Sequence, residues 1–278
     1  MLDAFAALAQ TLSYCGVLSA AGAVLAAATL RSGALAAQTL ARLTRAGAWL
    51  TIAATLFALG VLMLRLGDSL DAEIAAAVMM SNVGAAAGLR LSGAVLLLVT
   101  PRGDDDAFGR GMQLSAAVLM LASFVFSGHA AAEGVWPGII AAIHVAAAGW
   151  WVSSLIAMRV AFARGDAGAV SLVTRFSTLA RYAVGGLVVA GVLLIAALLD
   201  FSAFEITAYA RNLAIKLALV AAVLGLAAYN RFALTQGVIA LRATAIAALR
   251  RSIEIELVLI VGVLIATAVM TTYTSPHQ

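Results

Sequence analysis

Long runs of alanine, leucine, valine and isoleucine alternate along the chain with short stretches that carry charge, glycine or proline. Each run approaches 20 residues, about the length of an α-helix that crosses a hydrocarbon core roughly 30 Å thick. Helices are the expected spanning form because backbone groups in lipid must be satisfied within their own segment. We expect eight transmembrane helices, near residues 5–30, 46–66, 72–99, 112–131, 138–162, 177–199, 208–229 and 253–274.

The composition agrees with this interpretation. Of the 278 residues, 64% are hydrophobic and only 11% are charged, and the mean hydropathy is +1.07. These values lie far from those of a soluble domain with a polar surface. No connection between the predicted helices exceeds about 23 residues, which leaves no room for a soluble domain. We therefore predict an all-α, polytopic membrane helix bundle that forms a single integral membrane domain over residues 1–278.

Charged residues alternate in sign between successive connections. The even connections carry aspartate and glutamate, whereas the odd connections are rich in arginine. Because cytoplasmic loops carry the excess of basic residues, the odd connections are expected to face the cytoplasm and both termini the periplasm. The sequence pI of 9.7 then reflects topology, and no nucleic-acid partner is expected. The arginines in question are Arg31, Arg42, Arg45, Arg102, Arg110, Arg164, Arg175, Arg231, Arg242, Arg250 and Arg251.

Two of the three histidines flank the short turn "EGVWPG", which is predicted to lie at the periplasmic surface. By the rise of an α-helix, His129 lies roughly 3 Å and His144 roughly 9 Å below that surface. An ionisable group inside a span costs free energy and normally faces the bundle interior or a water-filled cavity. We therefore interpret His129 and His144 as functional residues, and His277 as part of a solvated tail.

Four methionines are predicted in the same leaflet. Met63 and Met270 fall roughly 5 Å below the outer edge, and Met79 and Met80 fall roughly 11 Å below it. Thioether and imidazole together suit copper, since methionine prefers Cu(I) and histidine accepts either oxidation state. The sequence thus predicts a copper entry site drawn from His129, His144 and these methionines. Methionine also serves as packing material in apolar helices, and that alternative stays open.

Charged residues within the spans need partners. Arg90 and Glu256 are both predicted near the cytoplasmic face, where they would pair with each other. Lys216 is predicted near the histidine layer, where it either pairs with Glu73, Asp200 or Glu205, or acts as a gate for a metal ion. Asn230, like Asn82, is expected to complete these networks with side-chain hydrogen bonds.

Trp151 follows His144 by seven residues, which places both side chains on one face of a helix. The imidazole and the indole are therefore predicted to point into the bundle together. Trp150 is predicted to point elsewhere, toward lipid.

Four stretches, in this order, resemble the CopD copper-resistance membrane proteins. They cover roughly residues 125–276 and read "SGHAA" with "IHVAAAGWW", "TRFSTLARYAVGGLVVAGVLL", "YARNLAIKLALVAAVLGLAAYNR" and "LRRSIEIELVLIVGVLIATAVMTTYTSP". The resemblance implies an inner-membrane protein that moves copper between periplasm and cytoplasm. It also implies a small periplasmic copper-binding partner of the CopC type, here a separate chain.

Two other functions remain open. His129 and His144 would also suit the axial ligands of one haem b in a membrane cytochrome. Alternatively, the chain presents copper to periplasmic partners without conducting it. No Walker-type GxxxxGK[ST] stretch and no nucleophile-elbow GxSxG occurs. We accordingly expect copper transport or handling, with Cu(I) or Cu(II) as cargo, and no enzymatic activity.

Overall fold

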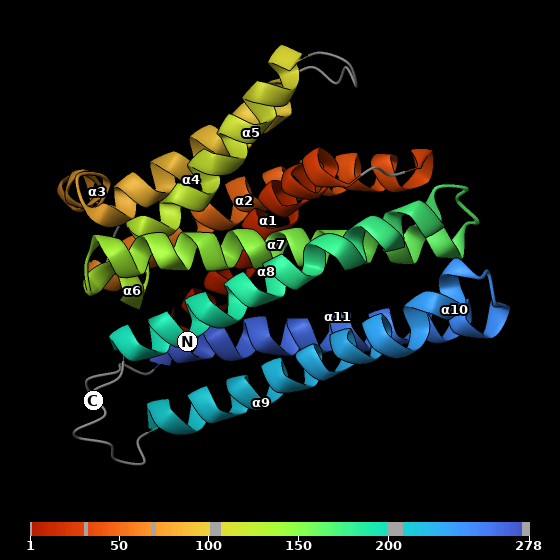
Figure 1. Ribbon diagram of the computed structural model, residues 1–278. Helices are drawn as coiled ribbons and strands as arrows, with labels where there is room; N and C mark the ends of the chain where they lie inside the picture. Colours follow the sequence, from red (N-terminus) through yellow and green to blue (C-terminus); the bar gives the residue numbers. More distant parts are fainter. Residues whose placement is uncertain (1, 31–32, 68–70, 101–106, 199–207, 274–278) are drawn as a thin grey trace.

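The computed structural model describes residues 2–30, 33–67, 71–100, 107–198 and 208–273, which contain helices and no strand (Figure 1). The elements are α1 (Leu2–Thr29), α2 (Ala34–Leu66), α3 (Ala72–Met79), α4 (Asn82–Val99), α5 (Ala107–Ala122) with the 3₁₀ turn η1 (Ser123–Val125), α6 (His129–Ala132), α7 (Val135–Ala163), α8 (Ala169–Leu198), α9 (Ala208–Tyr229), the π-helical turn η3 (Asn230–Leu234), α10 (Thr235–Ile239) and α11 (Ala243–Tyr273).

Within these ranges, eight helical segments are long and apolar enough to cross a membrane, which confirms the predicted fold class and number of spans. They are 2–29, 34–66, 82–99, 107–125, 135–163, 169–197, 210–239 and 243–270. The C-terminal ends of α1, α7 and α10 lie at one end of the bundle, and α1 and α7 begin at the other end (Figure 1).

Two predicted spans are divided in the structure. The predicted helix 72–99 breaks at Met80 because the Ser81 hydroxyl accepts a hydrogen bond from the Val83 backbone N–H at 3.2 Å and starts a new helix, α4. Residues 72–79 form the short α3 and belong to no span. The predicted helix 112–131 ends in η1, and Gly128, with φ +88°, separates it from α6.

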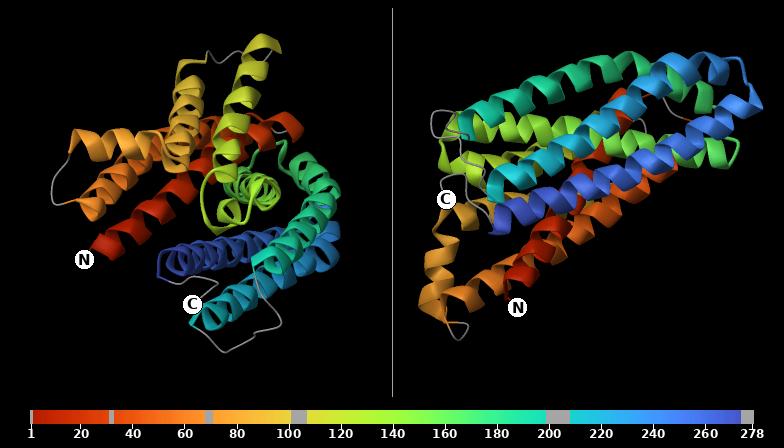
Figure 2. Two further views of the ribbon diagram at one scale, coloured as in Figure 1. Left: turned by 90° about the vertical axis from the view of Figure 1, so that its left-hand side faces the viewer. Right: turned by 90° about the horizontal axis from the view of Figure 1, so that it is seen from below.

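Helix α1 is the centre of the packing. It contacts α2, α5, α7 and α11, so the α4–α5 hairpin lies on one side of it and α8, α9 and α11 lie on the other (Figure 2). The crossing of α1 with α7 is made by Gly22 and Gly149. A Cβ on Gly22 would lie 2.2 Å from the Gly149 carbonyl, so the two backbones are in direct contact.

The connection between α7 and α8 is tied to the start of α2 by Asp166. Its carboxylate accepts hydrogen bonds from the backbone N–H of Ala36 at 3.0 Å and of Gly168 at 2.9 Å. Because the first N–H groups of a helix have no partner within the helix, this side chain caps α2 from a distant part of the chain. It holds the two halves of the protein together at this end.

Trp150 does not face lipid, which corrects the sequence-based expectation. The side chain is buried, its Nε1 donates to the Thr29 hydroxyl at 2.8 Å, and its ring stacks on Phe176 with centroids 5.4 Å apart. Trp150 and Trp151 both reach the core because α7 is flanked by α1 and α2 as well as by α8 and α11.

Candidate metal site

His144 lies on α7 and faces α8. Its Cε1 is 3.9 Å from the position that a Cβ on Gly191 would occupy, and the backbone of Leu187, one turn earlier, is within hydrogen-bonding reach of the ring. A Cβ at position 191 would make ordinary van der Waals contact with the imidazole, so the ring packs directly against α8. The residue is half-buried, and its Nδ1 is sealed from solvent without a hydrogen-bond partner among the described residues. A ring nitrogen in this position is available as a metal ligand.

Lys216 on α9 lies within electrostatic range of His144. It is half-buried, and in the described part of the chain no ion pair or hydrogen bond to it is found. The predicted pairing with Glu73 is not formed, because Glu73 is exposed on α3, which packs against α2 and α4 rather than α9. The other predicted partners, Asp200 and Glu205, lie outside the described residues.

The other predicted metal ligands are spread over several elements. His129 begins α6, but its side chain lies outside the described part of the structure. Met63 is half-buried near the end of α2, and Met270 is 6% exposed near the end of α11. Met79 and Met80 are 52% and 90% exposed at the end of α3.

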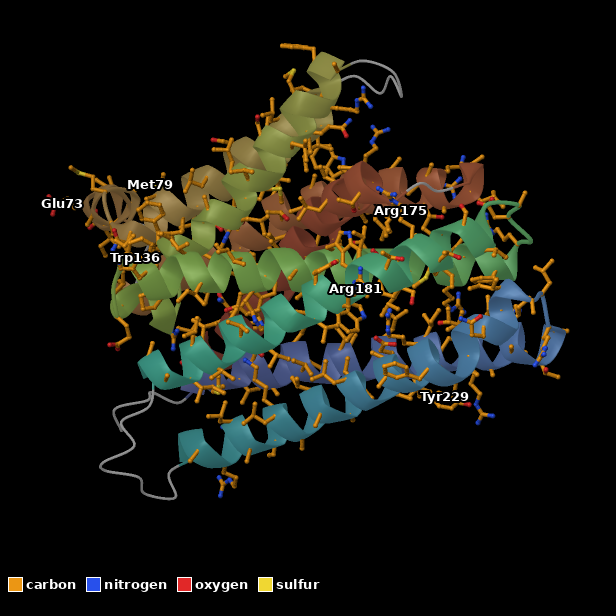
Figure 3. The ribbon with its side chains drawn as sticks, in the orientation of Figure 1. Glu73, Met79, Trp136, Arg175, Arg181 and Tyr229 are labelled. Carbon is orange, nitrogen blue, oxygen red and sulfur yellow. The ribbon has the colours of Figure 1, made fainter. Side chains whose placement is uncertain are left out.

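The structure therefore does not place Met79 and Met80 beside His144, because α3 lies against α2 and α4 whereas His144 faces α8. Figure 3 shows Met79 and Glu73 on α3, near the end of the bundle where Trp136, 76% exposed, begins α7. Across the described residues, no three histidine, cysteine, aspartate or glutamate side chains are grouped closely enough to hold a metal ion.

A second polar group lies two turns along α7. Trp151 donates from Nε1 to Glu256 Oε1 at 2.8 Å, and Asn230 donates from Nδ2 to Glu256 Oε2 at 3.2 Å. Glu256 is 1% exposed, and no described cation pairs with it. The Trp151 position lies roughly 10 Å along the helix from His144. His144 and Trp151 were predicted to share one face of α7. That face carries the imidazole and, through the bond from Trp151, contacts a buried carboxylate.

Asn230 is the first residue of η3, the π-helical turn that follows α9. Its Oδ1 is buried and has no described hydrogen-bond partner. Turns of π-helix inside α-helices are frequent at functional sites because the extra residue redirects a side chain. Asn230 therefore presents its Nδ2 to the Glu256 carboxylate and keeps an amide oxygen without a described partner.

Arg90 does not pair with Glu256, which corrects the sequence-based prediction. Its Nε, NH1 and NH2 groups donate to the hydroxyls of Ser123, Ser13 and Ser127 at 2.9, 3.3 and 2.8 Å. The reason is the break before α4: counted from Asn82, Arg90 lies only about 12 Å into the span. It packs against α1 and η1, on the side of α1 away from α11.

Sequence reasoning missed these serine partners because hydroxyls are common in spans and give no pairing signal. Ser123 and Ser127 are four residues apart, which is the spacing of side chains on one helical face. That spacing, together with an arginine inside a span, was the sequence feature that could have indicated these partners of Arg90.

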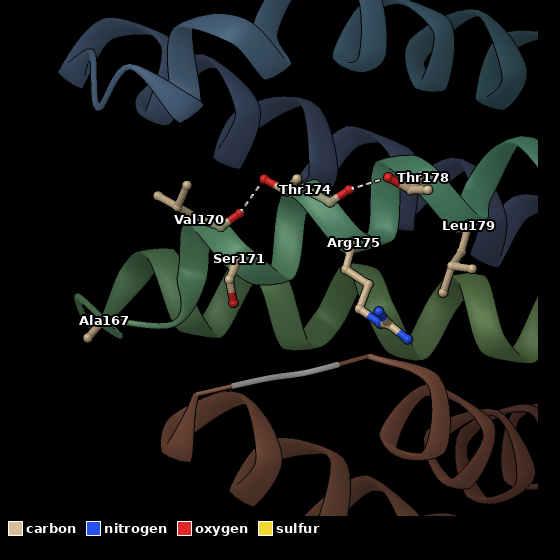
Figure 4. Close-up of a pocket in the computed structure, with 7 residues that line it drawn as sticks. All are labelled: Ala167, Val170, Ser171, Thr174, Arg175, Thr178 and Leu179. Atoms are coloured by element: carbon tan, nitrogen blue, oxygen red, sulfur yellow. Dashed lines mark hydrogen bonds between the residues drawn. The ribbon is translucent and has the colours of Figure 1, made fainter.

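A pocket with a volume of about 690 Å³ lies along one face of α8 (Figure 4). Arg175 is its one charged lining residue among those described. The hydroxyls of Thr174 and Thr178 donate to carbonyls of their own helix. This surface offers no set of metal ligands.

Comparison with known protein families covers both halves of the chain. Residues 1–139 match the family described as copper resistance protein D-like, N-terminal domain, and residues 170–270 match copper resistance protein D. No curated protein and no solved structure matches the chain. The first match spans half of the 278 residues and the second lies in the stretch that carries the resemblance. The chain therefore belongs to the copper resistance protein D family, a membrane family that handles copper.

Proposed function

We propose that this protein carries copper ions across the bacterial inner membrane and that His144 binds the ion on the way. The observation that carries the proposal is the buried, unpartnered Nδ1 of His144, held on α7 against the glycine of α8. Imidazole suits both oxidation states of copper. A site with few protein ligands binds weakly enough to release its ion, which transport requires.

Lys216 acts in this proposal as a gate. An ammonium group near His144 repels a copper ion, so the ion can occupy the imidazole only when the lysine side chain moves away or loses its proton. The side chain is free to do so, since no described residue holds it in an ion pair.

Glu256 provides the next binding position for the copper ion after His144. Its carboxylate, buried with Asn230 and Trp151, offers negative charge and oxygen atoms to a cation that leaves His144. Buried carboxylates inside transporters commonly mark ion pathways or proton relays. The route follows one face of α7 between the two positions.

The remaining predicted ligands bind copper where it enters the protein from the periplasm. Met63, Met270 and His129 lie at the end of the bundle that we assign to the periplasm. Met79 and Met80 are exposed on α3, where thioethers are accessible to a separate copper-binding protein of the CopC type. The protein then moves its cargo without chemical transformation and is not an enzyme.

The test is copper uptake by proteoliposomes together with copper binding. We expect His144→Ala to lower the initial rate of uptake roughly ten-fold or more, as loss of a ligand should. His277→Ala, the same substitution in the C-terminal tail, is the matched control and should keep the wild-type rate. Unchanged uptake by His144→Ala would overturn the proposal.

The same preparation separates the alternative functions. A copper-presenting scaffold binds copper in both variants but gives no uptake even as wild type. A haem b cytochrome gives a Soret band and sharp reduced-state bands in the absorption spectrum of the purified protein.

A further inference from the structure

The N-terminal half contains a cavity of its own, about 380 Å³ in volume. It is bounded by α1, α2, α4 and the segment between η1 and the end of α6. The cavity lies on the far side of α1 from α11 and shares no lining residue with the His144 and Glu256 groups. Its charged lining residue, among those described, is Arg90.

The charge of Arg90 is not neutralised by any described carboxylate. The side chain is 7% exposed, and its three hydrogen bonds go to serine hydroxyls. The Ser123 hydroxyl donates to the Met120 carbonyl at 2.7 Å, and the Ser127 hydroxyl donates to the Ser123 carbonyl at 3.0 Å. These hydroxyl protons are committed, so the serines accept from Arg90 and remain neutral.

A guanidinium has five N–H groups, and three of them are used in these bonds. The face of the Phe124 ring, with its centroid 5.3 Å from the guanidinium carbon, provides a further weak attraction. A buried charge inside a membrane bundle is costly unless a counter-charge lies near it. The guanidinium therefore keeps N–H groups that these hydrogen bonds do not use, and no described carboxylate neutralises its positive charge.

A second residue that lines the same cavity has a polar group without a described partner. Thr55 on α2 is 2% exposed and lines the cavity, and its Oγ1 is buried without a described hydrogen-bond partner. Many serine and threonine hydroxyls among the described residues donate to a carbonyl of the preceding turn, as that of Thr51 does at 2.8 Å. The Thr55 hydroxyl is thus an unpartnered donor on a residue that lines the cavity.

We propose that this cavity binds a phosphate group, with Arg90 as the charged ligand and the Thr55 hydroxyl as a second donor. The planar fork of a guanidinium matches the oxygens of phosphate, and the cavity is far larger than a halide ion needs. The phosphate group belongs either to an anionic lipid headgroup or to free inorganic phosphate. This inference does not depend on the proposed copper transport.

Thermal unfolding of the purified protein in detergent tests binding of free phosphate. Titration with inorganic phosphate should raise the unfolding temperature of the wild type by about 5 °C at a concentration about 100 times the dissociation constant, whereas chloride at equal ionic strength should not. Arg90→Gln should abolish the shift. Arg110→Gln, which removes an exposed arginine from α5, is the matched control and should keep it.

Thr55→Val keeps the side-chain shape and should weaken phosphate binding roughly ten-fold. This variant keeps the test decisive if Arg90→Gln fails to fold. Native mass spectrometry distinguishes the second source, since a bound anionic phospholipid should survive purification in the wild type and be lost in Arg90→Gln. Absence of both a phosphate-dependent shift and a retained phospholipid in the wild type, or persistence of either in Arg90→Gln, would overturn the proposal.

Discussion

At the scale of single residues, the buried charges of this protein are matched by neutral polar groups. Arg90 is held by three serine hydroxyls, and Glu256 by an indole and an amide. Ion pairs in the described residues, Arg65 with Asp3 and Arg159 with Glu254, lie instead at exposed positions. Neutral partners leave the charge of each group without a compensating charge among the described residues, which is the feature that both proposals use.

The bond from Trp151 to Glu256 can be compared directly with that from Trp150 to Thr29. A hydrogen bond to a charged acceptor contributes about 1.5–3 kcal/mol, against about 0.5–1.5 kcal/mol for a neutral one. We expect Trp151→Phe to lower the free energy of unfolding by about 1 kcal/mol more than Trp150→Phe does. Thermal or denaturant unfolding in detergent measures the difference. Equal losses would show that Glu256 does not carry a charge toward Trp151.

At the scale of helices, the sequence predicted the number of spans well because hydropathy over 20 residues is a direct measure of what lipid accepts. It predicted their boundaries less well. The helix start at Ser81 lies within an apolar stretch, and a single hydroxyl bond to Val83 decides it. The displacement of Arg90 from Glu256 follows from that break, so one capping interaction changed the pairing of two distant charges.

At the crossing of α1 with α7, the close approach of the helices depends on glycine. A Cβ on Gly22 would lie 2.2 Å from backbone atoms of Gly149, which no side-chain movement relieves. Gly22→Ala should therefore destabilise the protein by about 1–3 kcal/mol. Gly185→Ala, in an α8 position with open space around it, should be neutral or slightly stabilising because alanine favours helix. If the two variants unfold at the same temperature, α1 and α7 do not cross as described.

At the scale of the whole molecule, α7 occupies a particular place. The first family match ends at residue 139 and the second begins at residue 170. His144 and Trp151 lie between the two matches, on α7. Helix α7 packs against both α1 and α8 and joins the half that contains the Arg90 cavity to the half that contains Lys216 and Glu256. The local pattern of His144 and Trp151 was readable from the sequence, but their partners on α8 and α11 depend on this packing.

The central claim is that His144 binds copper, and X-ray absorption spectroscopy of the copper-loaded protein tests it most directly. We predict that wild-type protein gives the multiple-scattering signal of a coordinated imidazole and that this signal is reduced or lost in His144→Ala but kept in His277→Ala. Identical spectra for wild type and His144→Ala would contradict the account.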